Sequence, residues 1–462
     1  MIRLFDSLKT EVRPLALREP GRVSMYVCGP TVYGLPHMGH GRFTLVWDVF
    51  RRWLTFQGYE VNFVSNITDI DDKIINLAAG EQTTEADIAQ RYEQEWWNAM
   101  SKIGVAKPTH SPHATHYVAE MVTLIEGLIA KDIAYPLSDG VYFDTSRVAD
   151  YGALAGQPLD SLRAGARVEM VEAKRSPFDF ALWKKAKSGE PSWPASFGEG
   201  RPGWHTECVV MSLGLLGDGF DLHCGGLDLK FPHHENERAQ AIAAGHSFAQ
   251  HWAHNGFVMV EGEKMSKSLG NFTSLTDLLE RTDARAYRLL VLRSHYRSPI
   301  EVSPATIEDA ERALERLDSL ARRFELDQLA GDTFATATQP LPGELAGELA
   351  QRVTEFLDDD LNTPLAVAAL FEALSQANGL ADEGKTAEAQ HLAEAINTLF
   401  GALGLALIGR GGEIDAESAA IVRLRDEARA AKNWAEADRL RDSLVNLGWI
   451  VEDSSSGTVI RH

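Results

Sequence analysis

Several residue patterns that define common classes of protein are missing from this sequence. Only three cysteines occur in 462 residues, too few and too scattered for a disulfide framework. No apolar run reaches the roughly 18 residues of a membrane span, and no basic segment leads into an apolar one as in a secretory signal. We therefore expect a cytoplasmic protein that has no membrane partner.

Positive charge is also scarce. The chain has 45 Lys and Arg residues against 66 Asp and Glu residues, a formal net charge of −21 at pH 7. This balance excludes a protein that is basic over its whole surface, but it allows a local basic surface that meets nucleic acid. The signatures C-x-x-C and H-E-x-x-H are absent as well. Without H-E-x-x-H, a zinc-dependent hydrolase is disfavoured.

The composition that remains is globular, with 44% hydrophobic residues and a length that suggests about two to four domains. An N-terminal strand–helix–strand unit is predicted from "RVSMYVCGP" (22–30), "GRFTLVWDVFRRWLTFQG" (41–58) and "YEVNFVSNITDIDDK" (59–73). Such a unit opens an α/β fold with a doubly wound, Rossmann-like parallel sheet.

Changes in composition divide the chain further. Pro and Gly breaks predict an insertion between two halves of the sheet, and an Ala-, Leu- and Glu-rich pattern predicts a helical bundle before a small C-terminal domain. The last segment, "WIVEDSSSGTVIRH", is expected to form a short strand pair. The predicted units are the first half of the sheet domain 1–109, the insertion 110–203, the second half of the sheet domain 204–302, the helical bundle 303–408 and the C-terminal domain 409–462.

The stretch "GLPHMGHGRF" (34–43) lies between the first strand and its helix, at the edge where a doubly wound sheet binds ligands. Small residues let the backbone approach a phosphate there, and a helix N-terminus favours anions. His37 and His40 are near neighbours if the helix has begun, so both could donate to a phosphate whose charge grows in a transition state. The alternative is a pair of surface histidines on a turn.

A second stretch, "EGEKMSKSLGN" (261–271), places Lys264 and Lys267 among serines and glycines after a predicted strand. A mobile cationic loop of this kind could close over a triphosphate. The alternative is a solvated lysine loop without a ligand.

Together, "HMGH" and "KMSKS" resemble the two signature motifs of class I aminoacyl-tRNA synthetases, with Met38 at a position where isoleucine is usual. The blocks "NITDIDDK", "RPGWHTEC", "FPHHENE", "SHYRS" and "DDDLNTP" closely resemble the cysteinyl-tRNA synthetase family along nearly the whole chain. This resemblance implies a cysteine–tRNA ligase whose partners are ATP, L-cysteine and tRNA(Cys), and whose C-terminal domain reads the anticodon.

In the resembling family, a zinc ion at the positions of Cys28, Cys208, His233 and Glu237 binds the side chain of the substrate. Thiolates help to select zinc, and His233 and Glu237 share one helix face if Pro232 opens the helix. Spacing alone leaves the alternative of structural cysteines open, because Cys28 and Cys208 lie far apart in the chain. Zinc would bind a thiolate far better than a hydroxyl and so separate cysteine from serine without an editing domain.

The resemblance also assigns the remaining site residues. Trp204 is expected to close the amino-acid pocket and Asp228 to bind an amino group or a ribose hydroxyl, whereas His223 is either a pocket residue or a core histidine, and Cys224 a plain buried thiol. The expected catalytic and ATP-binding residues are His37, Gly39, His40, Lys264, Lys267 and Ser268. The expected substrate-binding residues are Gly29, Thr31, Asn66, Thr68, Trp204 and Asp228.

The implied reaction begins when the cysteine carboxylate attacks the α-phosphorus of ATP, with Mg²⁺, to give cysteinyl-adenylate and pyrophosphate. The terminal ribose hydroxyl of the tRNA then takes the aminoacyl group. A carboxylate is already a nucleophile, so the first step needs in-line positioning and neutralised phosphate charge rather than a strong base. One zinc ion per chain and a monomer are expected.

Two other functions stay open from the sequence. One is a ligase of the same fold that joins cysteine to an amino sugar, and the C-terminal domain disfavours it. The other is an inactive RNA-binding paralogue, which the intact motifs disfavour. In the C-terminal domain, Trp434 or Trp449 could stack on a base or pack in a core.

Overall fold

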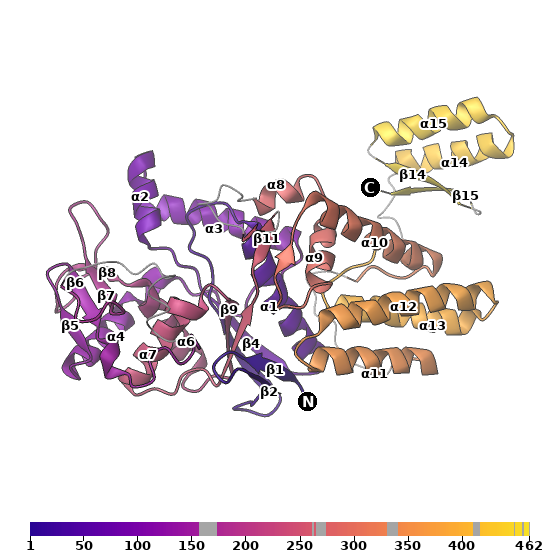
Figure 1. Ribbon diagram of the computed structural model, residues 1–462. Coiled ribbons are helices and arrows are strands. Elements are labelled where there is room, and N and C mark those ends of the chain that lie inside the picture. The colour runs from indigo at the N-terminus through magenta and orange to yellow at the C-terminus, as the bar shows by residue number, and fades with distance from the viewer. Residues whose placement is uncertain are drawn as a thin grey trace.

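The computed structural model describes residues 1–156, 173–260, 263–264, 274–329, 341–409, 416–447, 449–454 and 457–461. A parallel sheet of four strands lies at its centre (Figure 1). Its strands, in spatial order, are β10 (His251–Asn255), β9 (Leu222–Gly226), β3 (Arg22–Val27) and β4 (Glu60–Ser65). The predicted strand–helix–strand unit is therefore confirmed as β3, α1 (Met38–Phe56) and β4.

Register decides which loops meet at the edge of this sheet. Val27, the last residue of β3, lies beside Cys224 of β9 and beside Ser65 of β4. The segments that follow these strands therefore leave the sheet at the same edge, where a doubly wound fold binds its ligands. Helix α1 also starts there and packs Trp47, Phe50 and Trp53, all 0% exposed, into the core.

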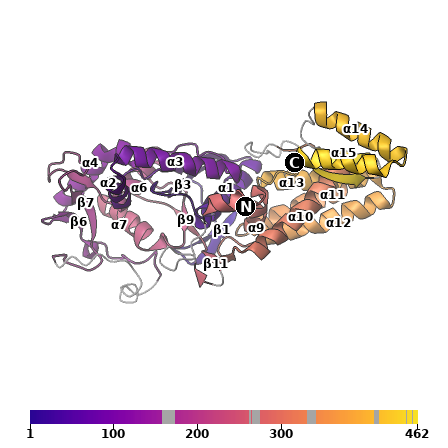
Figure 2. The same cartoon turned by 90° about the horizontal axis from the view of Figure 1, so that it is seen from above.

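The insertion forms a second sheet at one end of the molecule (Figures 1 and 2). Its strands β5 (Ala134–Pro136), β6 (Gly140–Phe143), β7 (Phe180–Lys185) and β8 (Gly200–Pro202) are antiparallel neighbours in that order. The helices that accompany it are η1 (Ala114–Tyr117), α4 (Val118–Ala130) and η2 (Thr145–Arg147). Helices α6 (Trp204–Leu216) and α7 (Glu235–Ala244) then return the chain to the central sheet.

A group of helices lies at the other end of the central sheet (Figures 1 and 2). Its members are α9 (Ala284–Leu292), α10 (Pro304–Arg323), α11 (Glu344–Asp358), α12 (Thr363–Asp382) and α13 (Thr386–Ala402). Beyond them lies a small unit of α14 (Ala416–Ala430), α15 (Trp434–Asn446), β14 (Ile450–Ser454) and β15 (Gly457–Arg461). The last two strands pair antiparallel, which confirms the predicted strand pair.

The structure also contains elements that the sequence patterns did not predict. They are the hairpin β1 (Arg3–Asp6) and β2 (Glu11–Pro14), helices α2 (Asp72–Glu81), α3 (Glu85–Lys102) and α8 (Leu275–Leu279), and the short strands β12 (Glu263–Lys264) and β13 (Ile300–Glu301). These two strands pair with β11 (Val258–Val260), which confirms the strand expected before "EGEKMSKSLGN". Among the described helices, none has both the length and the apolar character that crossing a bilayer requires.

Candidate active site

The two loops that follow β3 and β4 are locked together at the sheet edge. A Cβ atom on Gly29 would lie 1.7 Å from the carbonyl oxygen of Asn66, so only glycine permits this approach. The Asn66 side chain accepts through Oδ1 from the Gly29 amide at 2.9 Å and from the Tyr26 hydroxyl at 3.1 Å. Its Nδ2 therefore faces Thr68 and donates to Oγ1 at 3.2 Å.

The two histidines of the "HMGH" motif form the N-terminal cap of α1. His37 is the N-cap residue, and its Nδ1 accepts from the His40 amide at 3.2 Å, while the His40 Nδ1 accepts from the His37 amide at 3.3 Å. This reciprocal capping stacks the two rings with their centroids 3.5 Å apart. Both imidazoles thus lie at a helix end that favours anionic ligands, although His37 itself precedes the helix.

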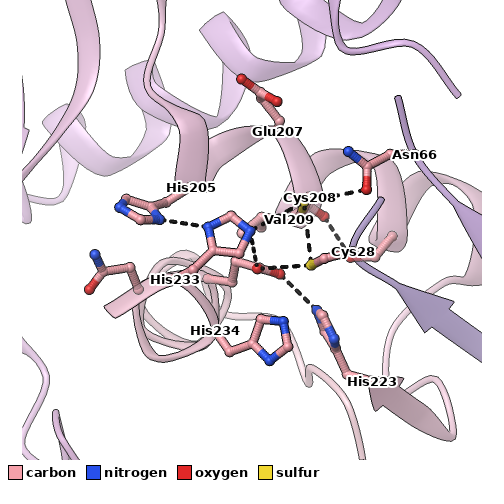
Figure 3. A network of polar contacts seen from close by, with 12 residues as sticks. Cys28, Asn66, His205, Glu207, Cys208, Val209, His223, His233 and His234 are labelled. Carbon is pink, nitrogen blue, oxygen red and sulfur yellow. Dashed lines mark hydrogen bonds and ion pairs between the residues drawn. The ribbon is translucent and has the colours of Figure 1, made fainter. Parts of the chain in front are cut away.

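Four side chains from three segments of the chain meet in one cluster, and Figure 3 labels Cys28, Cys208 and His233 of them. Glu237 is the fourth. The Sγ atoms of Cys28 and Cys208 are 3.7 Å apart, and Nε2 of His233 is 3.7 Å from the Cys208 sulfur. Oε1 of Glu237 is 3.0 Å from Nε2 of His233 and 3.5 Å from the Cys28 sulfur. All four ligand atoms lie within 4.8 Å of one another, and all four residues are buried.

These distances fit a tetrahedral zinc ion. Zinc–sulfur bonds of about 2.3 Å in tetrahedral geometry place two sulfur ligands about 3.8 Å apart, which matches the separation of Cys28 and Cys208. Two thiolates, an imidazole and a carboxylate are also ligands that zinc accepts. A second combination, Cys28, His223, His234 and Glu237, also brings ligand atoms within 4.8 Å. We favour the first set because it supplies two sulfur ligands.

His223 holds the Glu237 carboxylate rather than completing the first set. Its Nε2 contacts Oε2 of Glu237 at 2.7 Å, on the oxygen that faces away from His233. On the opposite side, Nδ1 of His205 lies 2.8 Å from Nδ1 of His233, and the Trp204 ring stacks on His233 with centroids 4.0 Å apart. Such outer contacts fix the orientation of groups that bind a metal.

Charge within the cluster suits a cation. Burial opposes ionisation of Cys208, but hydrogen bonds from Cys28 and His233 outweigh it and lower the pKa of Cys208 to about 6. Burial raises the pKa of the Cys28 thiol. Burial would also raise the pKa of the Glu237 carboxyl, but His233 and His223 outweigh this effect and hold that pKa well below its ordinary value. The buried His233 has its pKa raised to about 10 by Glu237 and Cys208. A divalent ion would replace the protons of Cys28 and His233.

A cavity of about 270 Å³ opens in front of the cluster. Trp204, 37% exposed, forms part of its wall. Eight of the predicted site residues line it: Cys28, Gly29, Thr31, His37, Gly39, His40, Trp204 and Asp228. Its lining also includes residues that the sequence did not single out: Pro30, Tyr33, Phe43, Lys73, Gly226, Leu229, Asn255, Gly256, Phe257 and Val258.

Five predicted residues lie in neither the metal cluster nor the cavity lining. Asn66 and Thr68 are 1% exposed and lie against the loop that carries Gly29 and Thr31. Lys264 ends β12, and Lys267 and Ser268 lie outside the described residues.

The turn before α7 places His233. Phe231 lies inside the turn η3 (Lys230–His234) but has extended backbone angles. Continuous helical backbone therefore begins at Pro232 and leads directly into α7, in agreement with the predicted place of Pro232 in the first turn of a helix. His233 and Glu237 accordingly share one face. Cys224 is 0% exposed and belongs to neither ligand set, which confirms a buried thiol.

Comparison with known proteins identifies the family of this arrangement. Residues 15–312 match the model of the class I (C) tRNA synthetase catalytic domain, 352–407 match the DALR domain, and 411–461 match the cysteinyl-tRNA ligase anticodon-binding domain. A cysteine–tRNA ligase from Chromobacterium violaceum is 44% identical over 100% of both chains. The chain belongs to the cysteine–tRNA ligase family.

Other members of this family and of its class support that placement. The cysteine–tRNA ligase of Laribacter hongkongensis is 43% identical, again over 100% of both chains. A structure of Mycobacterium tuberculosis methionyl-tRNA synthetase in complex with methionyl-adenylate has a TM-score of 0.60 at 17% identity and covers 83% of this chain and 89% of its own. That likeness shows the fold, and the match of 15–312 to the class I catalytic-domain model confirms the predicted membership of the class I aminoacyl-tRNA synthetases.

Proposed function

We propose that this chain activates L-cysteine with ATP and transfers it to the 3′ end of tRNA(Cys). The observation that carries the proposal is the cluster of Cys28, Cys208, His233 and Glu237 at the base of a cavity that His37 and His40 also border. A set of zinc ligands suits a substrate that carries a thiol. A helix N-terminus beside it can bind phosphate and so suits a reaction at phosphorus.

In this proposal the four cluster residues hold one zinc ion, which would bind the thiolate of the substrate. Zinc favours a thiolate over a hydroxyl, so serine is excluded by chemistry rather than by pocket shape, which alone separates such close analogues by only about 100-fold. Trp204 closes the pocket. Because its ring stacks on the metal ligand His233, the position of Trp204 depends on that of His233. Gly29, Thr31, Asn66 and Thr68 line or support the walls around the rest of the amino acid.

The catalytic roles follow from charge. His37 and His40, with the Gly39 backbone between them, meet the phosphates of Mg²⁺-bound ATP at the start of α1. Lys264, Lys267 and Ser268 meet them from the "KMSKS" segment. Asp228 lines the cavity and accepts from a ribose hydroxyl or an amino group. The cysteine carboxylate is then held in line with the α-phosphorus.

We further propose that the chain acts as a cytoplasmic monomer with the five units 1–109, 110–203, 204–302, 303–408 and 409–462. The C-terminal unit reads the tRNA. A match of 411–461 to an anticodon-binding domain supports this role and disfavours the amino-sugar ligase. The reciprocal cap of His37 and His40 together with a complete metal-ligand set disfavours an inactive paralogue.

The test is amino-acid-dependent ATP–pyrophosphate exchange on protein whose metal content has been quantified. We expect exchange with cysteine, none above background with serine or methionine, and about one zinc ion per chain. Charging of tRNA(Cys) would then identify the acceptor. Folded, zinc-loaded protein that exchanges with none of these amino acids would overturn the proposal.

A further inference from the structure

Arg42 is a buried arginine of α1 whose guanidinium group donates to main-chain carbonyl groups. The side chain is 1% exposed and lies two residues after His40, in the first turns of the helix. Nη1 donates to the Phe257 carbonyl at 2.5 Å, and Nη2 donates to the Ser298 carbonyl and, at 3.2 Å, to the Tyr296 carbonyl. Within the described part of the chain, no Asp or Glu side chain pairs with this group.

A guanidinium group with these partners is a poor source of stability. The cost of removing a charge from water can exceed the stabilisation from its hydrogen bonds, and an apolar side chain of similar volume avoids that cost. Burial lowers the pKa of Arg42 to about 10, so the group still carries its charge at pH 7. Its planar fork of donors holds several acceptors in fixed relative positions. What Arg42 supplies is therefore a fixed geometry among the segments that it joins.

These segments lie on two sides of the cavity. Phe257 and Val258 line it, as do His37 and His40 at the start of α1. The two sets follow different strands, because the histidines come after β3 and Phe257 comes after β10, with β9 between these strands. Arg42 thus links the two sides of the cavity through a single side chain.

The wall at Phe257 is itself tied to the other carbonyl groups that Arg42 contacts. The Gly256 amide donates to the Tyr296 carbonyl at 2.8 Å. A Cβ atom on Gly256 would lie 2.6 Å from the carbonyl oxygen of Ser298, so only glycine permits this approach. The main chain at Phe257 is therefore fixed to these two carbonyl groups, and Arg42 connects all three to α1.

We propose that Arg42 is a positioning residue, which holds the wall formed by Phe257 and Val258 against the two histidines of α1 in the geometry that ATP activation requires. The inference rests on the proposed function, in which both histidines meet the phosphates of ATP. The nucleotide then lies between the two sides, whereas the cysteine thiol lies at the metal cluster. A misplacement of about 1 Å can lower a rate about 100-fold. Loss of Arg42 should therefore impair the ATP-dependent step and spare cysteine binding.

Two variants of the zinc-loaded full-length chain test this role. Arg42→Met occupies much of the volume without a charge, and Arg42→Lys keeps the charge without the planar fork. Calorimetry measures the binding of Mg²⁺–ATP alone and of L-cysteine alone, and pyrophosphate exchange measures the rate at saturating concentrations of both.

We expect Arg42→Met to lower ATP affinity about 10-fold and the exchange rate about 100-fold. Cysteine affinity should stay within about 3-fold of wild type, which also shows that the variant is folded. Arg42→Lys should lie between Arg42→Met and wild type in ATP affinity and in rate.

A double variant separates alignment from a general loss of stability. If Arg42 aligns the wall with the histidines, Arg42→Met should lower the exchange rate by a smaller factor in a His40→Ala background than in wild type, because one of the aligned groups is already missing. An equal factor in both backgrounds would contradict alignment.

Arg18 offers a matched control, since its guanidinium group donates to the carbonyls of Leu216 and Asp218, both at 2.8 Å, and none of these three residues lines the cavity. Arg18→Met should leave both affinities and the rate within about 3-fold of wild type. Unchanged ATP affinity and rate in Arg42→Met, or an equal loss of affinity for ATP and cysteine, would overturn the inference. If Arg42→Met weakens ATP binding selectively but wild-type protein catalyses no cysteine-dependent exchange, the proposed function fails while the role of Arg42 in the nucleotide site stands.

Discussion

At the scale of single residues, His37 has two separable tasks. It caps α1 through Nδ1, and it borders the cavity where the phosphates of ATP are expected. Losing an N-cap side chain costs about 1 kcal/mol of stability, whereas losing a group that stabilises transition-state charge lowers kcat by about 100-fold or more. A substitution that restores only the cap can therefore separate the two tasks.

We predict that His37→Ala lowers both the free energy of unfolding, by about 1 kcal/mol, and the rate of pyrophosphate exchange, by about 100-fold. His37→Asn should recover the stability, because asparagine is a good N-cap residue, but not the exchange. Urea unfolding and exchange assays on the same preparations would measure both. Full exchange activity in His37→Asn would show that the imidazole acts only as a cap.

The cysteines give a matched pair of substitutions. Cys208 belongs to the proposed metal-ligand set, and Cys224 is equally buried but lies outside it. We predict that Cys208→Ser lowers zinc content well below one ion per chain and abolishes cysteine-dependent exchange, because the softer ligand is lost. Cys224→Ser should keep its zinc, as measured by metal analysis of dialysed protein. Equal zinc content in both variants would contradict the assignment.

At the scale of elements, the helix that carries "HMGH" is anchored by a buried charge cluster. Asp48 of α1 accepts from Arg52 at 2.9 Å, from Arg288 of α9 at 2.8 Å and from the Ala106 amide at 3.0 Å. Arg288 also donates to the Leu403 carbonyl directly after α13. Since the three charged side chains are at most 2% exposed, this cluster fixes α1 against the helical bundle.

Removing the charge of Asp48 should destabilise this joint strongly. Burial alone would raise its pKa, but Arg288 and Arg52 hold the pKa of Asp48 below its ordinary value. Its contribution is thus present above the usual carboxyl pKa of about 3.9 and is lost as the pH falls through the lower folded value. We predict that Asp48→Asn lowers the free energy of unfolding at pH 7 by about 3–5 kcal/mol.

Urea unfolding at several pH values would measure this loss, and the variant should show a flatter decline of stability in acid than wild type. Asp309 pairs with Arg293 at the surface and serves as the control. Asp309→Asn should change stability by no more than about 1 kcal/mol. A similar small change in Asp48→Asn would mean that the joint is not held by charge.

How much could be predicted differs between elements for physical reasons. The unit β3–α1–β4 was predictable because its apolar residues recur with the period of each element. The hairpin of β1 and β2 was missed because each strand has only four residues. The metal set came from family resemblance, since Cys28 follows β3 and Cys208 lies on α6, and the two meet only through tertiary packing that no local pattern encodes.

At the scale of the whole molecule, we propose that the C-terminal unit, which matches an anticodon-binding domain, reads the tRNA. The structure distinguishes its two tryptophans, which the sequence left equivalent. Trp449 is 4% exposed and donates to Ser418 at 2.8 Å, so it belongs to the core. Trp434 opens α15 and is 60% exposed. Of the two, Trp434 is the candidate for stacking on an unpaired base.

We predict that Trp434→Ala leaves cysteine-dependent pyrophosphate exchange unchanged and raises the KM for tRNA(Cys) by about 5- to 100-fold, in line with the loss of one stacked base. Trp449→Ala should instead destabilise the C-terminal unit by about 3–5 kcal/mol. Aminoacylation kinetics and circular dichroism would distinguish these outcomes. An unchanged KM for tRNA in Trp434→Ala would remove this residue from the interface.

The close approach at Gly29 has a consequence for protein engineering. Because the missing Cβ lets two loops interlock at Asn66, neither loop can be randomised without the other. A mutant library aimed at a new amino-acid substrate would therefore lose most of its clones to misfolding if it started there. Trp204 lines the pocket but lies on α6, outside the two loops. It is therefore the position at which amino-acid specificity can be changed first.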